Sequence, residues 1–137
     1  MTRVRLARGI RRAMIAHARR QYPNECCGFL IGNRQHVLHV LPLPNVDPRP
    51  RIRFRISDEQ HIEVRRLLRR FEPPLAIIGV YHSHPDGPAV PSSSDIREAN
   101  YSDWVFAVIG VSRRGARVKL FGIRSGRVRL LRPGRPK

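Results

Sequence analysis

A buried strand that runs into two histidines is the feature that most constrains the fold of this chain. Residues 75–80 read Leu-Ala-Ile-Ile-Gly-Val, a short apolar run that predicts a strand covered on both faces. Tyr81, His82, Ser83 and His84 continue the run. Side chains two apart on a strand point to the same face, so His82 and His84 can reach one ion together. We therefore expect a central strand that ends at a polar site.

A carboxylate follows the two histidines across a loop rich in turn-forming residues. Residues 86–88 (Asp-Gly-Pro) and Pro91 predict a tight loop, and Asp95 comes close to the start of a short helix. Asp95 could simply stabilise that helix terminus, but this would leave the histidines unexplained. Two imidazoles and one carboxylate are typical protein ligands of a catalytic zinc, with water in the fourth position. The set His82, His84 and Asp95 therefore favours a metal site.

The remainder of the chain alternates between helical and strand patterns. Apolar residues at helical spacing predict a helix over residues 6–20. Ser57, followed by two acidic residues, predicts the N-cap of a second helix that reaches about Phe71. Further strands are expected at residues 26–31, 37–43, 51–56, 104–111, 117–123 and 128–131, and a short helix capped by Ser93 or Ser94 is expected to run through Asn100.

Residues 51–56 alternate strictly between arginine and apolar side chains. Arg51, Arg53 and Arg55 would face one way, and the apolar residues between them the other, which predicts a half-exposed strand with a basic outer face. The order of elements is then α-β-β-β-α-β-α-β-β-β. We expect an α/β or α+β fold, a single domain of residues 1–137 built on one mixed β-sheet flanked by helices.

The composition limits the surroundings and partners of the protein. The formal net charge is +17, and 25 of the 27 basic residues are arginine, which indicates either an acidic partner or a compositional bias spread over solvated faces. Cys26 and Cys27 are adjacent, so a disulfide is not expected and a reducing compartment fits best. Neither a secretory signal nor a membrane span is recognisable. These observations predict a soluble, cytoplasmic protein.

The residues around the histidines resemble a known family. His82-Ser83-His84, seven residues, Ser92, two further residues and Asp95 are similar to the signature of the JAMM (MPN+) zinc metalloproteases. That signature also includes an upstream glutamate, which Glu25 matches within residues 24–32 (Asn-Glu-Cys-Cys-Gly-Phe-Leu-Ile-Gly). The resemblance extends over about residues 3–132 and implies the JAMM/MPN fold, with a cytidine-deaminase-like architecture.

The resemblance implies a role for each motif residue. His82, His84 and Asp95 would bind one zinc ion per chain, with a catalytic water as the fourth ligand. Glu25 would act as general base and then pass the proton to the leaving amine. Ser92 would donate a hydrogen bond to the oxyanion of the tetrahedral intermediate. Three serines occur in a row, so Ser92 is chosen by the spacing of the motif and not by its chemistry.

The resemblance also implies a substrate class. Family members hydrolyse a peptide or isopeptide bond after the C-terminal Gly-Gly of a ubiquitin-like protein, and this chain looks like the small prokaryotic members. Their implied substrates are ubiquitin-like sulfur carriers, which lose a C-terminal extension or an attached cysteine, a link to cysteine biosynthesis. A diglycine tail could add as a strand to a free sheet edge beside the zinc. The basic face of residues 51–55 would steer an acidic carrier.

Two other functions compete with this interpretation. A basic nucleic-acid-binding module would explain the charge but not the motif, so nucleic acid is the less favoured partner. A non-catalytic MPN scaffold would explain the fold, but such domains typically lack part of the ligand set, which is complete here. The sequence does not fix the oligomeric state, and a homodimer is compatible with it.

Overall fold

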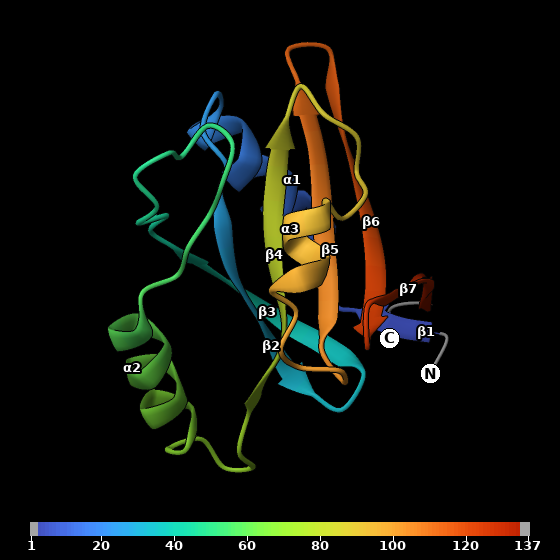
Figure 1. The fold of residues 1–137 in the computed structure, drawn as a ribbon. Coiled ribbons are helices and arrows are strands. Elements are labelled where there is room, and N and C mark those ends of the chain that lie inside the picture. Colours follow the sequence, from blue (N-terminus) through green and yellow to red (C-terminus); the bar gives the residue numbers. More distant parts are fainter. Residues whose placement is uncertain (1–2, 135–137) are drawn as a thin grey trace.

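Seven strands form one mixed sheet that closes on itself (Figure 1). The computed structural model describes residues 3–134. Its strands are β1 (Arg3–Leu6), β2 (Cys27–Asn33), β3 (His36–Leu43), β4 (Ala76–Pro85), β5 (Val105–Ser112), β6 (Gly115–Arg124) and β7 (Arg127–Gly134), and its helices are α1 (Ile10–Gln21), α2 (Asp58–Leu68) and α3 (Ser93–Arg97). The strand order is β1-β3-β2-β4-β5-β6-β7, and β1 pairs with β7 to close the sheet. The expected mixed sheet flanked by helices is confirmed.

Closure of the sheet limits where a substrate tail could add as a strand. Each strand between residues 3 and 134 has a neighbour on both sides, but the pairing is not continuous, since His84 and Pro85 of β4 pair with β5 and have no partner on β2. The pairing that closes the sheet is parallel and sets Arg3 opposite Arg132. Beside the metal site, the free edge of β4 is therefore confined to its last two residues.

β4 is the buried strand that the apolar run predicts. It pairs antiparallel with β2 and parallel with β5, and every residue from Ile77 to Ser83 is buried. Exposure begins at His84, where β4 extends past the end of β2. The strand therefore carries its last residues from the core to the surface.

Two apolar clusters cover the two faces of this part of the sheet. On one face α1 packs through Ile10, Met14 and Ala18, and Figure 1 shows this helix behind β4. On the other face α2 contributes Val64 and Leu68 to a second cluster. α3 also lies in front of the sheet in Figure 1. No helix of the described chain is long and apolar enough to cross a membrane.

The first strand and the start of the first helix differ from the sequence prediction. Residues 3–6 form β1, so Leu6 ends a strand and the helix begins at Ile10, after Gly9 with its positive φ of 87°. β1 has only four residues, and its partners β3 and β7 are distant in sequence. A local pattern of this length does not distinguish the two conformations.

The predicted strand over residues 51–56 is wrong. These residues form a turn and an irregular segment, and Ile52 is 58% exposed. The prolines before the segment lack an N–H group and cannot donate to a ladder. The main chain of Arg53 and Arg55 bonds instead to the side chain of Asn45. The basic–apolar alternation is therefore present without a strand.

The helix caps are partly as predicted. The Ser57 hydroxyl accepts a hydrogen bond from the Gln60 N–H at 3.1 Å, which confirms the cap of α2, although that helix ends at Leu68 and not near Phe71. The N-cap of α3 is Ser92, not Ser93 or Ser94, and the helix ends at Arg97, short of Asn100. Ser92 is favoured because Asp95 completes a capping box with it.

Candidate metal centre

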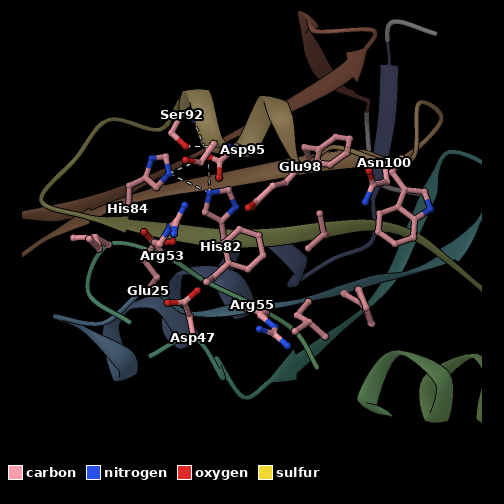
Figure 2. A pocket seen from close by; sticks show the side chains of 18 of the residues that line it. Glu25, Asp47, Arg53, Arg55, His82, His84, Ser92, Asp95, Glu98 and Asn100 are labelled. Atoms are coloured by element: carbon pink, nitrogen blue, oxygen red, sulfur yellow. Dashed lines mark hydrogen bonds and ion pairs between the residues drawn. The ribbon is translucent and has the colours of Figure 1, made fainter. Parts of the chain in front are cut away.

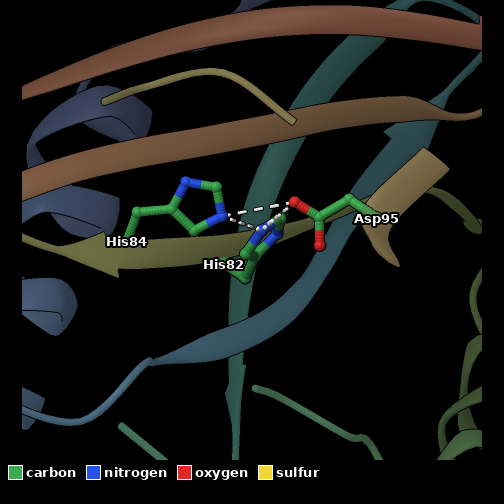
Figure 3. Close-up of side chains that lie close together, drawn as sticks. All are labelled: His82, His84 and Asp95. Atoms are coloured by element: carbon green, nitrogen blue, oxygen red, sulfur yellow. Dashed lines mark hydrogen bonds and ion pairs between the residues drawn. The ribbon is translucent and has the colours of Figure 1, made fainter. Parts of the chain in front are cut away.

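Three side chains converge at the end of β4 (Figure 3). His82 and His84 project from the same face of β4, and Asp95 projects from α3 towards them. The Nε2 atoms of the two histidines lie 3.1 Å apart, and Asp95 Oδ2 lies 3.0 Å from His82 Nε2 and 3.2 Å from His84 Nε2. The structure therefore brings together the three predicted ligands.

The donor atoms fit one tetrahedral ion. A zinc ion with bonds of about 2.0–2.1 Å separates its nitrogen and oxygen ligands by roughly 3.3 Å. The three observed separations are 3.0–3.2 Å, close to that value. Two imidazole nitrogens and one carboxylate oxygen are also the donor types that zinc prefers. The cluster therefore fits a metal site in its chemistry as well as in its geometry.

The tautomer of His84 supports this assignment. His84 Nδ1 lies 2.9 Å from the carbonyl oxygen of Pro88, which can only accept, so Nδ1 donates and Nε2 of the neutral ring carries a lone pair. That lone pair faces the carboxylate oxygen of Asp95. A proton or a metal ion at Nε2 removes the repulsion between these two atoms. A backbone carbonyl behind the ring is the usual support of a ligating histidine.

The side chain of His82 is more buried than that of His84. It is 4% exposed, and its ring stacks on Phe54 with a centroid distance of 4.4 Å and an angle of 17°. Burial lowers the pKa of His82, and this favours the neutral form that can bind a metal. Phe54 belongs to the irregular segment where the strand was predicted, so that segment covers one ligand of the site.

Asp95 is oriented by the cap of its own helix. The Ser92 N–H donates to Asp95 Oδ2 at 2.8 Å, and the Asp95 N–H donates to the Ser92 hydroxyl at 3.1 Å. The Ser92 hydroxyl accepts in this contact, so its own hydrogen stays available to another acceptor. Ser92 thus holds the carboxylate oxygen that faces both histidines.

Glu25 lines the same cleft and is 6% exposed. Figure 2 places it across the histidines from Ser92 and Asp95. Among the described residues its carboxylate has no hydrogen bond or ion pair, and burial raises the pKa of Glu25 to about 7. The residue after Glu25 is attached to β4, because the Ser83 hydroxyl accepts a hydrogen bond from the Cys26 N–H at 2.8 Å. Because Ser83 stands between His82 and His84 on β4, its side chain points to the opposite face of the strand from the two histidines.

The wall of the cleft combines charged and aromatic side chains. Its volume is about 870 Å³. Besides the three metal-type donors it is lined by Arg51, Arg53 and Arg55, here called the cleft arginines. Tyr101 and Trp104 also line it and stack at 3.9 Å between ring centroids. An extended chain in the cleft would meet both kinds of surface.

Several contacts at the site could not be predicted from the motif. Pro88 and Phe54 support the two histidines, and the side chain of Asn45 bonds to the main chain of Glu25. The only local signal was an asparagine within a proline-rich loop, which favours side-chain bonding to nearby backbone groups. Cys26 and Cys27 are free and buried and do not belong to the metal cluster.

The sequence matches a family model over most of its length. The model for prokaryotic homologs of the JAB domain matches residues 7–123. The chain belongs to this family. The resemblance to the JAMM family is thereby confirmed, and the His-His-Asp cluster lies within the matched residues.

Curated relatives support the prokaryotic JAB assignment and carry specific names. A probable TtuB-protein conjugate cleaving protease from Thermus thermophilus is 38% identical over 94 residues, 69% of this chain and 62% of that protein. A desampylase from Haloferax volcanii is 28% identical over 113 residues, 78% of this chain and 80% of that protein. A CysO-cysteine peptidase from Mycobacterium tuberculosis is 30% identical over 99 residues, 71% of this chain and 66% of that protein. The match therefore spans under two thirds of the length of the Thermus relative.

Solved structures share the fold. A solution structure from Desulfitobacterium hafniense has a TM-score of 0.84 and 29% identity, and covers 98% of this chain and 93% of that one. A crystal structure of a JAB1/MPN domain protein from Archaeoglobus fulgidus has a TM-score of 0.64 and 17% identity, and covers 98% of this chain and 100% of that one. At 17% identity the second likeness concerns the fold alone.

Proposed function

We propose that this protein is a zinc-dependent peptidase or isopeptidase that hydrolyses the bond after the C-terminal Gly-Gly of a ubiquitin-like protein. The observation that carries the proposal is the convergence of three zinc-type donors at one end of a cleft that also contains a buried, unpaired carboxylate. A metal beside a carboxylate base is the arrangement that metal-assisted hydrolysis requires. The family match supports the same chemistry.

Each residue of the site receives a role in this proposal. His82, His84 and Asp95 would hold zinc, which polarises a carbonyl and acidifies a bound water when present. Glu25 would accept the proton of that water and pass it to the leaving amine. The Ser92 hydroxyl, whose hydrogen is free, would donate to the oxygen of the scissile carbonyl as charge develops on it.

The environment of Glu25 suits a group that both accepts and returns a proton. Burial raises the pKa of Glu25 to about 7, close to neutral pH. A cation nearby would lower this pKa and favour the ionised form that takes up the proton. A group with a pKa near the working pH transfers protons in both directions with little loss.

The segment that replaces the predicted strand supports binding of an extended tail. Arg53 and Arg55 use their main chain to bond with Asn45 and Val46. Among the described residues, the main-chain groups of Phe54 and Ile56 form no hydrogen bond. Alternate residues of an extended segment point to opposite sides, so these groups would be free to pair with a tail in the cleft. A diglycine tail has no side chains to obstruct such pairing.

The substrate class rests on the relatives and on charge. The named relatives cleave a TtuB–protein conjugate or act on CysO-cysteine, so we propose a ubiquitin-like carrier as the partner, and a sulfur carrier in particular. The cleft arginines would attract acidic residues of such a carrier. The leaving group would be an attached cysteine or a longer chain joined through its amine.

The test uses a ubiquitin-like carrier whose Gly-Gly is followed by one further residue or joined to a lysine side chain. The wild-type protein loaded with zinc should release the amine, and Glu25→Gln should keep about one zinc per chain yet lose at least about 10²-fold in kcat, the usual contribution of a general base. Glu98→Gln, at another glutamate of the cleft, is the matched control. Full activity of Glu25→Gln would contradict the mechanism, and zinc binding without any cleavage would favour a scaffold.

A further inference from the structure

The side chain of Asn45 joins two segments that the sheet leaves unconnected. Its Nδ2 donates to the Glu25 carbonyl at 3.1 Å and to the Arg53 carbonyl at 2.9 Å. Its Oδ1 accepts from the Asp47 N–H at 3.1 Å and from the Arg55 N–H at 3.0 Å. An asparagine amide has two N–H donors and one oxygen with two lone pairs, so all of its hydrogen-bonding capacity is used.

These four bonds lie between the proposed base and the wall of the cleft. The Glu25 carbonyl belongs to the residue whose side chain faces the metal site, and Arg53 and Arg55 flank Phe54, which stacks on His82. One amide therefore fixes the main chain of Glu25 relative to the segment that covers a metal ligand. Asn45 itself does not line the cleft.

Few other contacts could replace this link. Pro44, Pro48 and Pro50 have no N–H, so the loop cannot build a ladder of its own. Apart from Asn45, the described main chain is fastened here by the Glu25 N–H to the Pro50 carbonyl at 2.7 Å and by the Val46 N–H to the Arg55 carbonyl at 3.0 Å. Within the loop, the Arg53 N–H also donates to the Arg49 carbonyl at 3.0 Å. The Asn45 side chain thus connects these two segments, as main-chain hydrogen bonds connect neighbouring strands elsewhere in the sheet.

We propose that Asn45 is a positioning residue that holds residues 53–55 against the segment bearing Glu25 and so sets the place of Glu25 beside the metal site. The kinetic consequence rests on the proposed role of Glu25 as general base, whereas the attachment of the loop does not. Asn45 acts through Glu25 and Phe54 and does not contact the reacting atoms.

The first experiment measures hydrogen exchange in the zinc-loaded protein and needs no substrate. In Asn45→Ala the amide hydrogens of Asp47 and Arg55 lose their acceptor and should exchange about tenfold faster or more, because local opening becomes easier. The Gln60 amide, bonded to Ser57 at the start of α2, should be unaffected. Asn33→Ala, at an exposed asparagine of β2 outside the cleft, is the control.

The second experiment separates kcat from KM on a peptide whose Gly-Gly is joined to a lysine side chain between a fluorophore and a quencher. Asn45→Asp keeps the accepting oxygen but loses both donors, so the Glu25 and Arg53 carbonyls are released. We expect kcat to fall about tenfold or more through misplacement of the base, with zinc content and melting temperature near those of wild type. Introduced into Glu25→Asp, the same substitution should change kcat less than about twofold, since the residue acts through Glu25.

The two experiments test different parts of the proposal, so either part can be contradicted on its own. Unchanged exchange of Asp47 and Arg55 in Asn45→Ala would overturn the proposal whatever the activity. Unchanged kcat in Asn45→Asp, or an equal loss in the Glu25→Asp background, would overturn the positioning role. If the wild-type protein does not cleave the peptide, the proposed function is contradicted, and the exchange measurement still decides whether Asn45 holds the loop.

Discussion

The largely buried carboxylate of Glu25 is costly to ionise. It is 6% exposed and lacks a hydrogen-bond or ion-pair partner among the described residues. Burial raises the pKa of Glu25 from 4.5 to about 7. The folded protein therefore binds this proton more tightly than the unfolded chain does, and folding is penalised wherever the carboxylate must be ionised.

This penalty gives a pH-dependent effect of Glu25→Gln on the metal-free protein. Between about pH 4.5 and 7 the folded state holds more protons at this site than the unfolded state, so the free energy of unfolding falls as pH rises through that window. Glu25→Gln removes the charge, and at pH 8 it should stabilise the protein by about 1–3 kcal/mol. Urea titrations at pH 8 and pH 4.5 measure the difference. An equal effect at both pH values would show that burial of charge is not the cause.

At the residue scale, the motif predicted the three side chains that converge at the end of β4 but not those that support them. His82, His84 and Asp95 meet because strand periodicity and the following loop bring them to one point. Asn45 and Phe54 act through tertiary contacts with segments distant in sequence, and neither has a spacing that signals its role. Supporting contacts of this kind depend on the final fold and not on local pattern.

At the scale of elements, a glycine in β5 lets the loop after β4 pass close to the main chain of β5. Gly110 is the partner of His84 in the β4–β5 register, and a Cβ at Gly110 would come within 2.8 Å of the Gly87 carbonyl oxygen and 3.1 Å of the Ala89 nitrogen. The loop that passes there contains Pro88, whose carbonyl fixes the His84 ring. A glycine in a neighbouring strand therefore shapes the metal site indirectly.

Gly110→Val should weaken metal binding because it displaces that loop. The valine side chain would collide with the backbone of Gly87 and Ala89, so the Pro88 carbonyl would no longer support His84. Loss of such support typically lowers metal affinity by about 10–100-fold. Competition with a chelator measures the affinity. Gly115→Val is the control, since nothing lies within 4 Å of a Cβ there, and equal affinity of the two variants would contradict this account.

The helices and strands with a long or regular sequence pattern were the ones predicted best. The buried strand β4 and the helix after Ser57 were predicted well because their periodicity or cap is strong. The four-residue β1 was missed because its partners are distant strands. Residues 51–56 have strand periodicity, but their main chain is bonded by a side chain and not by a neighbouring strand.

At the scale of the whole molecule, the net charge of +17 includes a cationic wall inside the cleft. The cleft arginines line the cleft that also holds the metal-type donors, through which the tail of the proposed carrier would pass. A field of one sign in a cleft raises the association rate of an oppositely charged partner, and salt screens it. Part of the charge is therefore placed where it can influence substrate capture.

Replacing the three cleft arginines by glutamine should lower kcat/KM for an acidic carrier by about tenfold at low ionic strength, and should flatten its salt dependence. Most of the change should be in KM, since the chemistry at zinc is untouched. Measuring kcat/KM at about 20 mM and about 300 mM salt tests this, because charge screening changes strongly over that range of ionic strength. Glutamine at Arg12, Arg19 and Arg127, exposed and outside the cleft, removes the same charge as a control. Equal losses from both triple variants would assign the effect to net charge.

If His82, His84 and Asp95 form one zinc site, metal analysis of the purified protein should show it. The wild-type protein, dialysed against zinc and then against buffer, should hold about one zinc per chain. His84→Ala should hold almost none, whereas His39→Ala, at an exposed histidine of β3, should hold as much as wild type. A wild-type protein without zinc, or a His84→Ala variant that retains it, would contradict the account.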